Sequence, residues 1–300
     1  MIMTSPAFMA KKPVAVRDRS VGHLVWVIIE YLALAIGALV ALFPLYVLLV
    51  ASVKSNAQIT YSNPLLFPDV WHWENFSTAW FFNANSSSNS ESMGMAFLYT
   101  AAITGVSVFL SVLFGSFVAY VLSRFDFKGK KIVKVLFLLA SFIPSITIQI
   151  SIFQLINQIN LFNTPWAIIL LYSGTDIVSI YIFLQFLDNV PKELDEAALV
   201  DGCNYFQIYG RIIMPVLRPA IATVCIIKGV AFYNEYYIPS LYWSDHYVIS
   251  TYLDKMVGAF GTSWGAVSAA AVIAIVPTII IFLLLQNQIY SGLTNGAVKS

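Results

Sequence analysis

Six long apolar runs constrain this chain more than any other feature of its sequence. Each has at least the roughly 20 residues that a helix needs to cross the hydrocarbon core of a bilayer. They span residues 24–53, 95–122, 132–153, 166–187, 220–242 and 266–288. Of the 300 residues, 59% are hydrophobic and 10% charged, whereas charged residues average about 25% in soluble domains. The sequence therefore predicts an all-α integral membrane protein with six transmembrane helices.

The basic residues between these runs are distributed unequally. Cytoplasmic loops of membrane proteins are enriched in Lys and Arg. One set of loops holds only Lys54 and Lys255. The termini and the other loops hold Lys11, Lys12, Arg17, Arg19, Arg124, Lys128, Lys130, Lys131, Lys134, Lys192, Arg211, Arg218 and Lys299. This asymmetry predicts that both termini are cytoplasmic, as is the loop that contains Lys192.

Residues 1–20 are predicted to form a basic cytoplasmic tail, and residues 21–300 the transmembrane domain.

Several classes of site find no support in the sequence. There is no G-x-x-x-x-G-K-[ST] loop and no metal-binding spacing, so we assign no catalytic residue and no metal ligand. The net charge of +1 gives no indication of nucleic acid. No disulfide between Cys203 and Cys225 is expected. The polar external segment Asn83–Ser92 has no assigned role.

A polar stretch, ELDEAALVDGCNYFQIYGRIIMP (193–215), separates two of the apolar runs. Pro191 suits the first turn of a helix, where its missing N–H leaves no hydrogen bond unmade. Gly202 is expected to end this helix, because a residue just past a helix end often needs φ > 0. Acids near the start complement the helix dipole, and they are Glu193, Asp195 and Glu196.

A second helix is predicted directly after Gly202. Asn204 can cap it, with Gln207 three residues later in the capping-box relation, and it should end by Pro215. The first helix is about 12 Å long and too short to be stable alone in water. It therefore either packs on a partner or is a passive connector between two spans.

The spacing of this stretch resembles the EAA loop of ABC importer permeases. The matching positions are Glu196, Ala197, Ala198, Gly202, Ile212, Met214 and Pro215, with Met214 where that family usually has leucine. In that family the loop forms the coupling helix that docks in a groove on the ATPase subunit. The resemblance places this loop at about 188–217 and implies ATPase-docking roles for Glu196, Ala197, Ala198, Asp201 and Gly202.

Other segments are similar to the carbohydrate-uptake, maltose-type branch of these permeases, and closest to the shorter of its two subunits. In the segment Phe232–Trp243, Tyr233 occupies a position where Trp is common in that family. The segments are LFPLYVLLVASVK (Leu42–Lys54), WENFSTAW (Trp73–Trp80), FYNEYYIPSLYW (Phe232–Trp243) and YSGLTNGAVKS (Tyr290–Ser300).

The resemblance implies the ABC type I importer permease fold in a bacterial or archaeal cytoplasmic membrane. The function it implies is ATP-driven import of a sugar through a pathway of which this chain forms half. The implied partners are a homologous second permease, two ABC ATPase subunits, an extracytoplasmic binding protein, the sugar and membrane lipids. ATP and Mg²⁺ would be used by the ATPase subunits, so this chain would bind no cofactor and would not itself be an enzyme.

Polar residues inside the spans are candidates for the transport pathway. Asp176 and Lys228 are predicted to pair across two packed helices, because a lone charge in a membrane is costly. A polar, aromatic run at the end of the fifth span can hydrogen-bond a sugar and cover its ring, although an interfacial aromatic belt has the same composition. The run is Tyr233, Asn234, Glu235, Tyr236 and Tyr237.

Two alternative functions remain open at this point. One is a stand-alone, proton-coupled transporter in which Asp176, Lys228 and Glu235 form a proton relay. The other is a membrane assembly factor whose cytoplasmic loop only scaffolds a partner. The predicted helix–glycine–helix loop favours the importer over the proton-coupled carrier, because such a carrier has no motor subunit to dock.

Overall fold

The structure is a computed structural model that describes residues 21–84, 91–174, 177–259 and 263–297. The basic tail 1–20 and most of the segment Asn83–Ser92 lie outside these residues. The chain divides into two units, residues 1–47 and 48–300, which are described separately. The first unit contains most of α1 (Val21–Ser52), a helix whose apolar side chains are exposed along nearly its whole length.

Three of the six predicted spans are continuous helices, as expected from their unbroken apolar runs. They are α1, α4 (Met93–Arg124) and α15 (Trp264–Ala297). Each is long and apolar enough to cross a membrane. Pro44 and Pro277 lie inside α1 and α15 without ending either helix.

The other three predicted spans are each divided into two helical segments. The third is α5 (Lys130–Ser141) and α6 (Ser145–Gln158), which meet at 101°. The fourth is α7 (Pro165–Ser173) and α8 (Ile177–Leu187), at 43°. The fifth, predicted over 220–242, corresponds to α12 (Arg218–Asn234), which forms a bent pair at 76° with residues 205–216. The count of six spans is therefore approximate, because it requires each bent pair to be one span.

Pro144 explains why the third span is not a straight helix. The residue before a proline is pushed out of the helical region, and Pro144 itself is extended, with ψ 126°. The 12 residues of α5 rise about 18 Å, which is less than the roughly 30 Å of a hydrocarbon core. The span predicted over 132–153 therefore corresponds to this bent pair of helices. The fifth span also ends earlier than predicted, at Asn234, and α13 (Tyr237–Tyr242) follows it.

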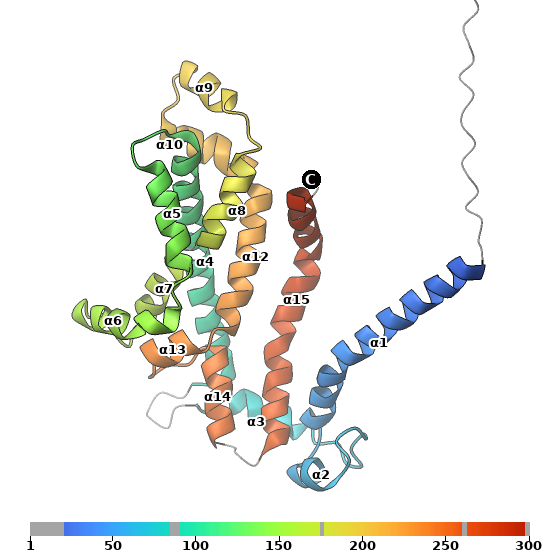
Figure 1. The fold of residues 1–300 in the computed structure, drawn as a ribbon. Coiled ribbons are helices and arrows are strands. Elements are labelled where there is room, and N and C mark those ends of the chain that lie inside the picture. Colours follow the sequence, from blue (N-terminus) through green and yellow to red (C-terminus); the bar gives the residue numbers. More distant parts are fainter. Residues whose placement is uncertain (1–20, 85–90, 175–176, 260–262, 298–300) are drawn as a thin grey trace, which may run out of the picture. The chain divides into compact units, whose positions relative to one another are not determined.

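The second unit is a helical bundle organised around α4. This helix packs against α7, α8 and α12, and α12 packs in turn against α15. In Figure 1, α9 (Glu193–Val200) and α10 (Tyr205–Ile208) lie at one end of the bundle, and α3 (Glu74–Phe81) and α14 (Ile249–Ala259) at the opposite end. We refer to these as the α9 end and the α3 end. The short α2 (Asn56–Tyr61) precedes α3.

At the α3 end, buried polar groups hold the loops together. Lys54 is almost fully buried, and its ammonium donates to the carbonyls of Asn63 (3.0 Å) and Pro64 (3.3 Å). The Asn75 amide donates to the carbonyls of Ser52 (3.0 Å) and Lys54 (2.9 Å). Gly265, at the start of α15, lies directly against the Lys54 carbonyl and the Asn75 amide because it has no side chain. The segment after α1 is thereby fixed against α15.

Candidate functional site

The polar stretch forms a helix, a glycine turn and a second helix, as predicted. The first helix, α9, spans Glu193–Val200. Pro191 precedes it by two residues instead of standing in its first turn, a small correction. Gly202 has φ +85°, which confirms the predicted left-handed turn. A Cβ at Gly202 would meet no atom within 4 Å, so glycine is required there by backbone conformation and not by space.

The start of the second helix, α10 (Tyr205–Ile208), has the predicted capping box. Asn204 Oδ1 accepts from the Gln207 N–H at 2.9 Å, and Gln207 Oε1 accepts from the Asn204 N–H at 2.9 Å. The helix does not end by Pro215 as predicted. It continues through a π-helix, η1 (Tyr209–Ile213), into α11 (Met214–Val216).

The π-helix accounts for a proline inside this segment. Pro215 has no N–H, and in a regular helix its ring would clash with the carbonyl one turn earlier. In the wider turn the Met214 N–H donates to the Tyr209 carbonyl, five residues back. The segment then bends by 76° at Leu217 and enters α12.

The two faces of α9 have different environments. Asp195 and Ala198 are 7% and 6% exposed and face the rest of the chain. Glu196 and Ala197 are exposed, as are Asp201 and Gly202 in the turn. Val200 is 88% exposed, which is unusual for a valine. Of the five residues to which the resemblance gives docking roles, Ala198 therefore packs against its own chain, and the other four lie on the surface.

Asp195 anchors α9 to the end of α4. Its Oδ2 lies 2.8 Å from Arg124 Nε, and the two side chains are 10% and 6% exposed. Arg124 Nη2 also donates to the Val190 carbonyl at 3.0 Å. Sequence reasoning treated Asp195 only as a complement to the helix dipole and missed this ion pair. Two features of the sequence could have indicated this ion pair. Arg124 ends a long apolar run, and Asp195 lies on the same helix face as Ala198, three residues later.

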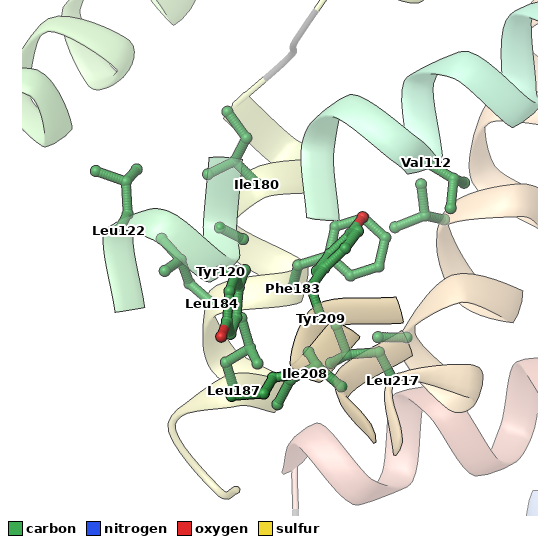
Figure 2. Close-up of a cluster of buried hydrophobic side chains, with 14 of the residues drawn as sticks. Val112, Tyr120, Leu122, Ile180, Phe183, Leu184, Leu187, Ile208, Tyr209 and Leu217 are labelled. Carbon is green, nitrogen blue, oxygen red and sulfur yellow. The ribbon is translucent and has the colours of Figure 1, made fainter. Parts of the chain in front are cut away.

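A hydrophobic cluster lies beneath the loop and joins it to α4 and α8 (Figure 2). Tyr209 extends from η1 toward α4, where its hydroxyl lies 2.8 Å from Ser116 Oγ and 3.2 Å from the Leu113 carbonyl. The buried members that surround it include Tyr120, Phe183, Leu187, Ile208, Ile213 and Leu217. The loop thus contacts α4 at two levels, through the ion pair and through Tyr209.

The candidate pathway residues do not form one wall. The Tyr233 hydroxyl donates to the Ala274 carbonyl at 2.6 Å, and its ring lines a cavity of about 1190 Å³ between α3, α4, α12 and α15. Asn234 donates to the Val230 carbonyl, and Glu235 accepts from the Tyr237 N–H at 2.9 Å. Tyr236 donates to Asp254 on α14 at 3.1 Å. Of the five, Tyr233 alone lines this cavity.

The lining of the cavity is mostly apolar. Its polar side chains are few and include Thr100, Thr104 and Thr278, beside aromatic residues such as Trp80 and Phe97. A sugar needs many hydrogen-bond partners, so this part of the chain by itself does not form a sugar site. Asp176, the predicted partner of Lys228, lies outside the described residues. The Lys228 ammonium lies 5.6 Å from the centre of the Phe232 ring.

This chain resembles known proteins in sequence and in fold. A family model described as "Binding-protein-dependent transport system inner membrane component" matches residues 111–294, which include α9 to α12. The chain belongs to this family. Its members are inner-membrane components of ABC transporters, and this agrees with the apolar helices and with the resemblance of the EAA loop.

Individual relatives extend the similarity to nearly the whole chain. The melibiose/raffinose/stachyose import permease protein MelC of Bacillus subtilis (strain 168) is 34% identical over 270 residues, which cover 88% of this chain and 94% of that protein. The arabinooligosaccharides transport system permease protein AraQ of Halalkalibacterium halodurans is 30% identical over 273 residues, 87% of this chain and 92% of that protein.

The fold also has a counterpart among solved structures. A chain in the crystal structure of a bacterial ABC transporter involved in the import of the acidic polysaccharide alginate superimposes with a TM-score of 0.76. The match covers 89% of this chain and 98% of that chain at 21% identity. The predicted ABC importer permease fold is therefore confirmed.

Proposed function

We propose that this chain is one of two permease subunits of an ATP-driven, binding-protein-dependent importer of a sugar or oligosaccharide. Support comes from relatives whose names describe permeases for melibiose, raffinose and stachyose and for arabinooligosaccharides. A second solved alginate transporter is in complex with an alginate-bound periplasmic protein, which supports a binding protein as a partner here. Family membership favours this function over a stand-alone proton-coupled carrier or an assembly factor.

In this proposal α9 is the coupling helix and the α9 end is cytoplasmic. Two ABC ATPase subunits bind ATP and Mg²⁺, and one of them docks on α9. The second permease forms the other half of the pathway, and the binding protein delivers the sugar at the α3 end. ATP-driven closure of the ATPase pair pulls on α9, and the permease pair alternates between inward- and outward-facing states. The sugar is not chemically changed, and this chain binds no cofactor.

The observation that carries this proposal is the contrast between the two faces of α9. Its inner face is fixed to the chain by Asp195 and Ala198, while its outer face exposes Glu196, Ala197 and Val200. A passive connector has no need of a buried ion pair to hold it in place. A rigid, exposed helix end of mixed charge and apolar character suits a protein groove.

Substitutions at Ala197 test the docking role. Ala197→Arg should lose the ATPase on co-purification and abolish sugar uptake in vesicles, because the long charged side chain cannot enter a groove shaped for a methyl group. Ala197→Ser is the matched control and should retain both. Ala197 is exposed, so neither change affects the core. Normal ATPase recovery and uptake with Ala197→Arg would remove the main support for this role.

The run from Tyr233 to Tyr237 remains our proposal for part of the sugar route. It lies where α12 ends and the backbone turns into α13, and Asn234, Tyr236 and Tyr237 are exposed there. Discontinuous helices supply free polar groups at membrane depth in many transporters. Residues of the second permease would have to complete the site.

A further inference from the structure

A second, polar cavity lies beside α9 and has no part in the docking surface. It has a volume of about 480 Å³ and is formed by the end of α4, the first turns of α5 and the connection from α8 to α9. Four cations and two carboxylates line it: Arg124, Lys130, Lys134, Lys192, Asp188 and Glu193.

Two of the four cations already have carboxylate partners outside the cavity. Arg124 pairs with Asp195, and Lys130 Nζ lies 2.8 Å from Asp126 Oδ1. The hydrogen bond from Lys130 lowers the pKa of the Asp126 carboxyl below its ordinary value. Within the described residues, Lys134 and Lys192 form no ion pair. The two carboxylates of the lining, Asp188 and Glu193, belong to exposed residues, as does Lys192, while Lys134 is partly buried.

The start of α5 adds a second feature that favours an anion. Helix N-termini carry a partial positive charge and unpaired N–H groups, and acidic residues normally occupy the first turn. The first turn of α5 instead holds Lys130 and Lys131 and no acid. The preceding residue is Gly129, with φ +96°, which has no side chain to cap the helix. An external anion at this position would accept from the remaining N–H groups and lie beside Lys130, which also lines the cavity.

The remainder of α5 indicates where that anion comes from. Beyond its basic first turns, α5 exposes large apolar side chains, with Ile132 65%, Leu136 58% and Leu139 55% exposed. A basic end on an exposed apolar helix matches a phospholipid, which has a phosphate at one end and acyl chains behind it. Basic pockets between membrane helices bind lipid headgroups for this reason.

We propose that this cavity binds the phosphate of a phospholipid headgroup, with Lys134 and Lys192 as the main cationic contacts and the acyl chains along the exposed face of α5. The site is separate from the docking surface, but Lys192 and Glu193 belong to both the cavity lining and the start of α9. A bound lipid would therefore hold the base of α9 against α5.

Native mass spectrometry of the purified, delipidated transporter tests this site. The complex is titrated with phosphatidylglycerol and, separately, with diglucosyldiacylglycerol of the same acyl chains, which has no phosphate. The variant Lys134→Gln/Lys192→Gln removes the two unpaired cations of the cavity. The matched control, Lys128→Gln/Lys131→Gln, removes two exposed lysines that do not line it.

One tightly bound phosphatidylglycerol per chain is expected, with no comparable binding of the glycolipid. The cavity variant should bind it about 30-fold more weakly, because each lysine near a headgroup contributes about 1 kcal/mol and 1.4 kcal/mol is a factor of ten. The control should bind within about twofold of the unmodified chain, since its lysines lie outside the cavity. Equal losses in the two variants would indicate a diffuse basic surface and overturn the proposal.

Two further arms identify the occupant. Millimolar inorganic phosphate should leave the lipid bound, because the acyl chains add affinity that free phosphate lacks; displacement would mean that the site takes free phosphate instead. Lipid that binds only after the ATPase subunits are removed would mean that a carboxylate of the ATPase fills the cavity in the assembled transporter. Either result would contradict a lipid site.

Discussion

Arg124 Nε and Asp195 Oδ2 lie 2.8 Å apart at the junction of α4 and α9, with both side chains at least nine-tenths buried. This ion pair joins the end of the central membrane helix to the helix proposed to receive the ATPase. It is one of several contacts between the loop and α4, which also include Tyr209 with Ser116 and the stacked rings of Phe206 and Phe117. The position of α9 therefore depends on its contact with the bundle as well as on the loop itself.

Removing one charge of this pair should destabilise the α9 end more than removing both. Asp195→Asn leaves a buried guanidinium without its partner, which typically costs about 3–5 kcal/mol. Asp195→Leu combined with Arg124→Met should cost less than either single change. Thermal unfolding of the detergent-solubilised protein measures this. Asp188→Asn, the same change at an exposed position, is the control and should leave the midpoint unchanged.

Gly202 should tolerate substitution only by residues that adopt φ > 0. Gly202→Val places a β-branched residue at φ +85° and should cost about 1–3 kcal/mol of strain. Gly202→Asn should cost clearly less, because Asn occupies the left-handed region more readily. Gly210→Val is the matched control, since a side chain there also meets no atom within 4 Å but φ is not positive. Equal effects of valine at both positions, measured by ATPase co-purification and unfolding, would contradict the conformational explanation.

Gly265 should resist any side chain at all, for a steric reason. A Cβ there would overlap the Lys54 carbonyl oxygen and come within 2.7 Å of Asn75 Nδ2. Gly265→Ala should therefore destabilise the α3 end by about 1–3 kcal/mol, as overpacking does. Gly258→Ala, in α14, has open space around its Cβ and should be neutral. Unfolding midpoints of the two variants decide the matter, and identical values would argue against this close approach.

Asn234 and Glu235 should be needed for transport more than for folding. Within the part of the chain that the structure describes, their side chains hydrogen-bond only to nearby backbone, at Val230 and Tyr237. Replacing both with alanine should therefore cost only about 1 kcal/mol per hydrogen bond. Sugar uptake in vesicles should fall while the complex still assembles and hydrolyses ATP. Uptake at the unmodified rate would exclude these side chains from the sugar route.

The sequence allowed the long helices and the local turn chemistry to be predicted, because those signals are local. Continuous apolar runs identified α1, α4 and α15, and the types of Gly202, Asn204 and Gln207 identified the turn and the capping box. The breaks in the other spans were missed because apolar composition is the same in a straight helix and in a bent pair. Pro144 was the visible signal for one of them.

The support of the loop was harder to predict because it depends on contacts between distant segments. Nothing near Asp195 identifies Arg124 as its partner, and nothing near Tyr209 identifies Ser116. The E-A-A triplet gave Ala197 and Ala198 the same docking role, yet a helix turns about 100° per residue. The two side chains therefore face different ways, and Ala198 belongs to the core.

Disulfide cross-linking along α9 tests the coupling role most directly. In a background with Cys203 and Cys225 replaced by serine, single cysteines are introduced at Ala197, Ala198 and Val200, with Lys131 on α5 as an exposed control. The ATPase carries cysteines along its docking groove. The account predicts cross-links from Ala197 and Val200, which also places the α9 end in the cytoplasm, and none from the buried Ala198 or from Lys131. Absence of cross-links at Ala197 and Val200, or equal cross-linking at Lys131, would contradict it.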